Sequence, residues 1–402
     1  FAYYMERQDD DSQIVWKYNL KDTMGGIFYY SNIMILNNEC EIQNLIKQCP
    51  TGYGKCFQEN EMVLTSTGYK YAKDVKVNNL VYSMKDNEVV LKRVVDKWYS
   101  KKKQIKIKTR NGIEIIVSPE HIMFTQRGYI EAKEITKDDY LYYLCSPLNY
   151  GKDIDENEMK FISMMIFDGS CSGENIQFSK PFYTEIYKEF MKVCDELHFG
   201  YNNHTCKDRD CNILSIRKNE GRPKELLEKY GLYGYYSTNK RLPQEFFTMS
   251  LKQRYEFIGI MLATDGYIPK YSKNGGNNVG ITLSNKELCK DIQLLMSTCG
   301  IYSNLSYKRS KINEKMFDSW VLTIPDEFIE VIYKNCYCYQ KQDSLIERYE
   351  YINNLSIKVY SNSVNYPKEV LKDCKEFKKI VNKQWSRNKT FKREIVHKYI
   401  ND

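Results

Sequence analysis

Two Asp-Gly pairs, each at the end of a strongly apolar segment, are the residues of this 402-residue chain best suited to hold a metal ion. Asp168 follows "EMKFISMMIF" and Asp265 follows "RYEFIGIMLAT". The apolar runs predict two buried helices, and the glycine behind each aspartate is a C-terminal helix signal. If the helices pair, two carboxylates and the helix-end carbonyls meet, an arrangement that a hard cation such as Mg²⁺ would stabilise. Mg²⁺ held in this way can activate water against a phosphodiester.

The segments around both pairs follow the same order, which indicates an internal duplication. Each apolar helix precedes a strand, an amphipathic helix and two more strands, over residues 158–218 and again over residues 254–325. Ser163, Gly259 and Ala263 are small and would let the two apolar helices approach closely. For one copy alone, a simple helix cap would be the preferred interpretation of Asp-Gly, but the duplication favours a functional site. We therefore expect an α+β domain built from two repeats.

The segments "FISMMIFDGS" and "FIGIMLATDG" resemble the two signature helices of the LAGLIDADG homing endonucleases. The resemblance implies that Asp168 and Asp265 are catalytic residues that bind Mg²⁺, and that the protein cuts both strands of double-stranded DNA lying on its β-strands. It also implies a monomer with an internal pseudo-two-fold repeat. The segment "NKRLPQEFF" resembles the family's Lys-x-x-Pro motif. Lys240 is thus a candidate auxiliary catalytic lysine that would stabilise phosphate charge, with an ordinary solvated surface lysine as the alternative.

Two features depart from the family pattern. Phe167 precedes the first aspartate where the family prefers a small residue, and Ala263-Thr264 replaces the usual Asp-Ala. The bulky Phe167 is expected to splay the helix pair, so a DNA-binding module without nuclease activity stays open as an alternative. Basic and apolar residues alternate in "SIRK", "YSKNGG" and "LSYKRSK", as in sheet faces that meet phosphate, although any one such segment is more often a solvated sheet face.

A second group of residues with chemistry surrounds Cys56. In "CPTGYGKC", Gly52, Gly54 and Lys55 match a phosphate-binding P-loop, but Cys56 takes the place of the Ser or Thr whose hydroxyl would ligate Mg²⁺. A thiol is a poor ligand for so hard a cation. The loop resembles those of helicase- or terminase-type ATPases, which implies that Gly52, Gly54 and Lys55 bind ATP only in the uninterrupted host protein.

The chain behind Lys55 lacks the helix that a P-loop needs. Residues 56–147 form short, turn-punctuated runs typical of strands, with a hairpin signal at Asn111-Gly112. Cys56, together with the segment from Ser118 to His121, resembles the N-terminal splicing motifs of inteins, whose Hint domain is an all-β horseshoe. The resemblance implies that the Cys56 thiol attacks the Lys55 carbonyl, that His121 protonates the leaving nitrogen and that Ser118 holds the scissile bond, without a cofactor. The alternative for His121 is a satisfied core histidine.

These motifs together predict a multidomain chain, an intein with an embedded endonuclease that interrupts a P-loop. Residues 1–55 are expected to be a host (N-extein) segment with a strand over 25–36 and a helix over 38–47. Residues 56–150 would be the N-terminal part of the splicing domain, 151–340 the endonuclease, and 341–402 a polar helical extension. Asn401 follows Ile400 and is not terminal, so we expect the first acyl shift and thiol-triggered cleavage but not ligation. A P-loop NTPase with unusual insertions is the rival interpretation.

The composition is typical of an intracellular globular protein. The chain is 42% hydrophobic and 28% charged, and its net charge of +8 permits a nucleic-acid partner without requiring one. No apolar run is long enough to span a membrane and no signal peptide is visible. The thirteen cysteines are therefore expected to be reduced thiols in the cytoplasm of a microbial or viral host. His204, Cys206 and Cys211 are spaced too loosely for us to expect a tetrahedral zinc site.

Overall fold

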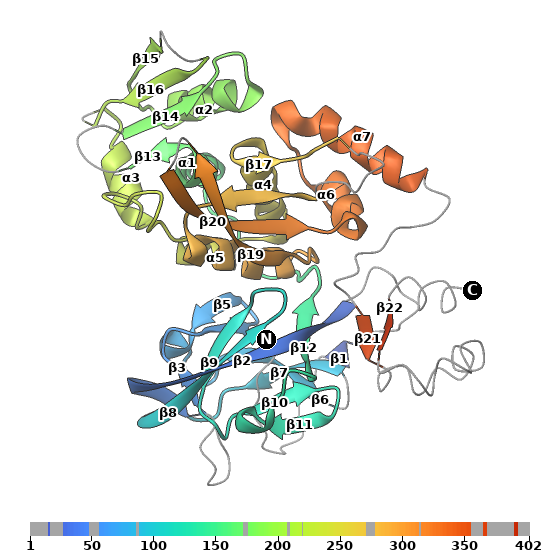
Figure 1. Ribbon diagram of the computed structural model, residues 1–402. Helices are drawn as coiled ribbons and strands as arrows, with labels where there is room; N and C mark the ends of the chain where they lie inside the picture. Colours follow the sequence, from blue (N-terminus) through green and yellow to red (C-terminus); the bar gives the residue numbers. More distant parts are fainter. Residues whose placement is uncertain are drawn as a thin grey trace. The chain divides into compact units, whose positions relative to one another are not determined.

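The computed structural model divides the chain into two compact units (Figure 1). Unit 1 comprises Phe1–Pro147 and Tyr360–Asp402, and unit 2 comprises Leu148–Val359. The structure describes residues 15–16, 27–47, 56–85, 88–171, 176–206, 210–218, 220–270, 278–312, 315–354, 365–367 and 390–392. The predicted P-loop residues Gly52, Gly54 and Lys55 lie outside the described residues. Within the described residues, no helix is both long enough and apolar enough to cross a membrane.

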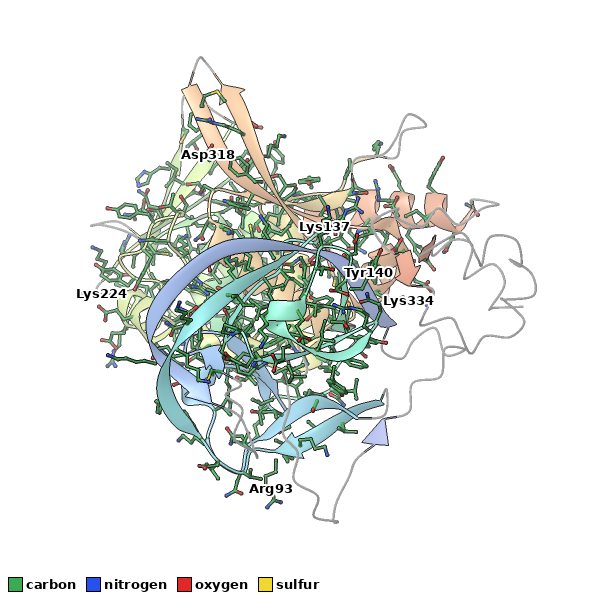
Figure 2. All side chains as sticks on the ribbon, turned by 60° about the horizontal axis from the view of Figure 1, so that its bottom comes forward. Arg93, Lys137, Tyr140, Lys224, Asp318 and Lys334 are labelled. Carbon is green, nitrogen blue, oxygen red and sulfur yellow. The ribbon has the colours of Figure 1, made fainter. Side chains whose placement is uncertain are left out.

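Unit 1 is built from antiparallel strands in two main sheets. The five-stranded sheet has the order β1-β7-β6-β4-β5, and the seven-stranded sheet has the order β11-β10-β12-β2-β3-β9-β8. Figure 2 shows the long strands β2 and β8 curving side by side. The strands are β1 Val15–Trp16, β2 Ile27–Lys47, β3 Cys56–Gln58, β4 Met62–Thr65, β5 Gly68–Tyr71, β6 Leu80–Lys85, β7 Glu88–Arg93, β8 Trp98–Thr109, β9 Glu114–Val117, β10 Ile122–Thr125, β11 Gly128–Glu131, β12 Tyr140–Cys145, β21 Asn365–Pro367 and β22 Thr390–Lys392.

The helix expected over residues 38–47 is wrong, because β2 continues as a strand to Lys47. This stretch pairs with β8, from Cys40 opposite Gln104 to Lys47 opposite Trp98, and its last residues also pair with β3. Non-local ladders such as these satisfy the backbone groups that a helix would have satisfied locally. The strand expected over residues 25–36 is present as the first part of β2.

Unit 1 contains a duplication that the motifs did not reveal. Thr65 pairs with Gly68 and Thr125 with Gly128, and each threonine hydroxyl donates to the glycine carbonyl, at 2.7 and 3.0 Å. Both glycines have a positive φ, 113° and 90°, as the tight turn requires. A one-turn 3₁₀ helix follows each hairpin, η1 Ala72–Asp74 and η2 Ala132–Glu134, so unit 1 contains two similar hairpin-and-turn motifs.

Unit 2 contains both predicted repeats in the same order. The sheet of the first repeat has the order β13-β14-β16-β15 and that of the second has the order β17-β18-β20-β19. The first repeat contains α1 Glu156–Phe167, β13 Gly169–Ser170, β14 Ile176–Lys180, α2 Glu185–Glu196, β15 Tyr201–Thr205, β16 Asn212–Ile216 and α3 Pro223–Lys229. The second contains η3 Gln244–Thr248, α4 Leu251–Ala263, β17 Gly266–Tyr267, β18 Val279–Leu283, α5 Lys286–Ser297, β19 Asn304–Ile312, β20 Lys315–Ile324, η4 Asp326–Phe328, α6 Ile329–Asn335, η5 Tyr339–Lys341 and α7 Gln342–Asn353.

The apolar helices α1 and α4 pack against each other in the core of unit 2. Phe167 is accommodated there without splaying the pair, because its ring lies 5.7 Å from that of Phe257 and is only 8% exposed. Gly259 was expected to face the other apolar helix, but it lies against the backbone at Tyr337. A Cβ added at Gly259 would lie 2.3 Å from the Tyr337 carbonyl oxygen, so the glycine admits this backbone segment against α4.

Candidate functional site

The two aspartates lie at the adjacent C-terminal ends of α1 and α4. Asp168 is the C-terminal cap of α1, with its amide donating to the Met164 carbonyl, and Asp265 directly follows the cap residue of α4, Thr264. The Asp168 side chain is 12% exposed, whereas Asp265 is an exposed residue. Burial, and then the neighbouring Asp265 carboxylate, raise the pKa of Asp168 to about 7. The helix pairing thus brings the two predicted carboxylates together, close enough for the Asp265 carboxylate to raise the pKa of Asp168.

Each of these helix ends is closed by a lysine, which is buried in the first repeat and half-buried in the second. Lys240 Nζ donates to the carbonyls of Met165 (2.7 Å), Ile166 (3.1 Å) and Gly169 (2.7 Å) at the end of α1. Its side chain is 1% exposed, so the alternative of a solvated surface lysine is wrong. Burial lowers the pKa of Lys240. As placed, this ammonium neutralises the helix C-terminus, and contact with a phosphate would require it to leave these carbonyls.

Lys341 takes the equivalent position in the second repeat and was missed by the sequence motifs. Its Nζ donates to the carbonyls of Leu262 (2.8 Å), Thr264 (3.0 Å) and Gly266 (2.6 Å) at the end of α4. Burial, with a smaller effect of the nearby Lys180, lowers its pKa to about 8. The sequence "YQKQDS" lacks the proline that marks Lys240, but a search one repeat after Lys240 would have come within a few residues of Lys341.

Lys180 is a third lysine at the aspartate pair. Its Nζ lies 3.0 Å from Asp168 Oδ2, as an ion pair without the angle of a hydrogen bond, and donates to the Thr264 carbonyl at 3.1 Å. It is the last residue of β14, in the expected strand "NIQFSK". Its contacts depend on how the strand lies over the two helix ends, so no local pattern points to it.

The donor set at the aspartate pair suits a hard divalent cation. It consists of two carboxylates and nearby backbone carbonyls, and the buried Asp168 Oδ2 accepts no hydrogen bond. Within the described residues, no group of three or more His, Cys, Asp and Glu side chains could hold a metal, and the aspartate pair itself supplies two carboxylates. Mg²⁺ usually keeps several waters and binds substrate phosphates beside one or two carboxylates, so two aspartates are an adequate protein contribution.

The residues that follow Lys240 are held by the buried carboxylate of Asp291. Arg241 Nε donates to Asp291 Oδ2 at 2.7 Å, and the Leu242 amide donates to the same oxygen at 3.1 Å. Asn285 Nδ2 donates to the Lys240 carbonyl at 2.6 Å. These bonds tie the Lys-x-x-Pro segment to α5, so the first repeat's lysine is positioned by the second repeat.

The three residues singled out around Cys56 lie together in unit 1. The Cys56 amide donates to Ser118 Oγ at 3.1 Å, and the Ser118 amide donates to the Cys56 carbonyl at 2.9 Å. His121 lies one turn further on, with its amide donating to the Ser118 carbonyl and its ring centroid 4.4 Å from that of Phe57. All three side chains are at most 1% exposed. The nitrogen of the predicted scissile bond is therefore hydrogen-bonded by the serine expected to hold it.

The segments expected to contact DNA are only partly within the described residues. "YSKNGG" lies outside them, whereas "SIRK" belongs to the end of β16 and "LSYKRSK" to β19. The β19–β20 hairpin exposes large side chains, with Tyr307 51%, Phe317 48% and Met316 49% exposed. Arg309 pairs with Asp318, which is labelled on this hairpin in Figure 2. The hairpin thus presents aromatic, apolar and charged side chains to solvent.

Residues 252–364 match the LAGLIDADG-like domain family. The ATP-dependent DNA helicase Hel308 of Methanocaldococcus jannaschii is 24% identical over 300 residues, which are 67% of this chain and 23% of the helicase. A probable translation initiation factor IF-2 of the same organism is 27% identical over 157 residues, 32% of this chain and 13% of the factor. This chain therefore spans less than a quarter of the length of either curated relative.

Several solved structures are similar to part of the chain, among them those of two homing endonucleases. A variant of the homing endonuclease I-DmoI, in complex with its target DNA in the presence of Mg, is 12% identical with a TM-score of 0.32, and the match covers 45% of this chain and 97% of that chain. The homing endonuclease I-WcaI, bound to its DNA recognition sequence, is 15% identical with a TM-score of 0.28, and the match covers 45% of this chain and 80% of that chain.

Replacing Lys240 with Met should destabilise unit 2. The substitution leaves the carbonyls at the end of α1 without their donor, which should cost about 1–3 kcal/mol of unfolding free energy. Urea denaturation followed by circular dichroism measures this, with Lys290→Met, an ion-paired lysine on α5, as the matched control. Unchanged stability combined with lost DNA cleavage would instead favour the direct phosphate role expected from the sequence.

The stability of the metal-free protein should fall as pH rises towards neutrality. Because the pKa of Asp168 is raised on folding, its contribution to stability is fully present below the unfolded value near 3.8 and is lost as pH rises through about 7. Asp168→Asn cannot ionise, so the variant should gain stability relative to wild type between about pH 4 and 7. Urea denaturation in EDTA at pH 5 and pH 8 checks this; an equal difference at both pH values would contradict it.

Proposed function

We propose that this chain, which carries a LAGLIDADG-like domain over residues 252–364, hydrolyses phosphodiester bonds of double-stranded DNA with a divalent cation held by Asp168 and Asp265. One observation carries the proposal. Two copies of the same fold pack their apolar helices together so that one carboxylate from each meets at paired helix C-termini. A structural cap would not need a second carboxylate that raises the pKa of Asp168, whereas a cation site needs both carboxylates as ligands.

The chain's own residues have separate tasks in this proposal. A bound Mg²⁺ would polarise the phosphodiester and lower the pKa of a bound water. Asp168 and Asp265 hold the cation, and Lys240 and Lys341 hold the ends of α1 and α4 that present the carboxylates. The exposed side chains of β19 and β20, with those of β15, would lie against the DNA.

We further propose that unit 1 is an intein splicing domain that cleaves the Lys55–Cys56 bond. The Cys56 sulfur would attack the Lys55 carbonyl carbon, forming the C–S bond of a thioester as the C–N bond breaks. The thiol loses its proton and the leaving nitrogen gains one, which His121 would supply. The mutual backbone and side-chain hydrogen bonds of Cys56 and Ser118 support this role, because they hold the nitrogen that must leave.

The comparisons support a module found within unrelated hosts. A DNA helicase and a translation initiation factor have different functions, yet each resembles this chain over a minor part of its own length. An intein inserted at a P-loop would meet two demands with one residue. The residue after an intein must be Cys, Ser or Thr to accept the acyl group, and a P-loop needs Ser or Thr after its lysine. ATP would then be a ligand of the spliced host protein only.

Dithiothreitol should release a fragment that ends at Lys55. A thiol intercepts the thioester that the Cys56 shift forms, so mass spectrometry of the treated full chain should detect residues 1–55. Cys56→Ala should abolish the release, and His121→Ala should slow it by about 10²–10⁴-fold, the usual contribution of a general acid. Cys145→Ala, a buried cysteine of β12, is the control. Release that survives Cys56→Ala would exclude the splicing function.

Mg²⁺ should allow the full chain to cut the host gene from which the inserted coding sequence has been removed. Asp168→Asn and Asp265→Asn should each lower the cleavage rate by more than about 10²-fold, since several kcal/mol of transition-state stabilisation depend on the cation. DNA affinity should be retained in a gel-shift assay, because the strand residues are unchanged. Glu330→Gln on α6 is the control. If wild type binds this DNA but leaves it uncut, the DNA-binding module without nuclease activity is the better interpretation.

A further inference from the structure

Lys180 has contacts unlike those of the other two lysines at the aspartate pair. Lys240 and Lys341 each give three hydrogen bonds to carbonyls at a single helix end. Lys180 instead spans the two halves of the site, with Asp168 Oδ2 of the first repeat at 3.0 Å and the Thr264 carbonyl of the second at 3.1 Å. Its ammonium therefore lies against a carboxylate and a carbonyl that a hard cation would also use.

The second repeat has no equivalent of this lysine. Gly169 pairs with Phe178 in the first sheet, as Gly266 pairs with Ile281 in the second. Lys180 lies two residues after Phe178, so its counterpart is Leu283, two residues after Ile281. The fold thus does not require a cation at this strand end. The lysine makes the two halves of the site unequal.

We propose that Lys180 is a built-in counter-ion of the aspartate pair, which a divalent cation must displace in order to bind at Asp168. The proposal rests on the proposed function, because it takes Asp168 and Asp265 as the cation site. Mg²⁺ binds carboxylate oxygens at about 2.0–2.1 Å. An ammonium 3.0 Å from the same oxygen would then face a second positive charge at short range in a partly buried site, which is unfavourable.

This role differs from that of a lysine that only stabilises phosphate charge. A counter-ion that the cation must displace lowers the affinity of the protein for that cation, even when no DNA is present. A phosphate-binding lysine leaves that affinity essentially unchanged and affects only the DNA complex. Cation binding to the DNA-free protein therefore separates the two roles without measuring cleavage.

The test titrates the full chain with Mn²⁺ alone, in the absence of DNA, and follows free Mn²⁺ by electron paramagnetic resonance. Lys180→Met and Lys180→Gln should each bind Mn²⁺ at least about tenfold more tightly than wild type, the scale on which one nearby charge shifts an ionic equilibrium. Lys180→Arg keeps the charge and should bind as wild type does. Lys290→Met, whose lysine is similarly exposed and ion-paired on α5, should also leave binding unchanged.

The outcomes distinguish this proposal from the proposed function. If the folded Lys180→Met and Lys180→Gln variants bind Mn²⁺ no more tightly than wild type, while Asp265→Asn weakens binding, the counter-ion role is wrong and the cation site stands. If neither Asp168→Asn nor Asp265→Asn alters Mn²⁺ binding, the aspartate pair is not a cation site and both proposals fail. Circular dichroism identifies any variant that has not folded. If one of the two neutral Lys180 variants does not fold, Mn²⁺ binding by the other one tests the counter-ion role.

Discussion

The packing of α1 against α4 is the constraint on which the rest of unit 2 depends. The C-terminal ends of the two helices lie next to each other, so their free carbonyls make the region negative. An aspartate at each end adds a carboxylate to this region. Burial and mutual repulsion disfavour this arrangement, as the raised pKa of Asp168 indicates. The domain tolerates it because three ammonium groups, on Lys180, Lys240 and Lys341, surround the helix ends.

The two lysines at the helix ends, one buried and one half-buried, are themselves unfavourable until their ammonium groups are hydrogen-bonded. Desolvation lowers the pKa of both Lys240 and Lys341, which means that the surroundings disfavour their charged forms. Each recovers stability through three hydrogen bonds to carbonyls that the helix geometry leaves without donors. Lysine and helix end are therefore mutually dependent, and this explains why both repeats keep the arrangement although the lysines lie in different local sequences.

The sequence predicted those parts of this site that are encoded locally. Each apolar run ending in Asp-Gly carries its own helix and its own stop signal, so α1, α4 and the aspartates could be predicted without tertiary information. Lys180 could not, because its carboxylate and carbonyl partners are brought close only by packing, and the repeat spacing locates Lys341 only to within a few residues. The strand β2 was mistaken in part for a helix for the same reason, since its pairing partners lie far along the chain.

The Thr65 and Thr125 hairpins were visible as a repeated Thr-x-x-Gly pattern, but nothing in either copy alone marks it as structural.

The candidate groups of the two units differ in their exposure to solvent and in the interactions that hold them. In unit 2 the candidate groups are carboxylates and lysines, several of them partly exposed and held by ion pairs, as the proposed binding of a cation and a polyanion would require. In unit 1 the candidate groups lie in a β core, are at most 1% exposed and are held by hydrogen bonds between β3 and the segment behind β9. An intramolecular acyl shift needs no substrate access, only a fixed geometry between sulfur, carbonyl and proton donor. Burial that would prevent catalysis on an external substrate is therefore compatible with the acyl shift proposed for this unit.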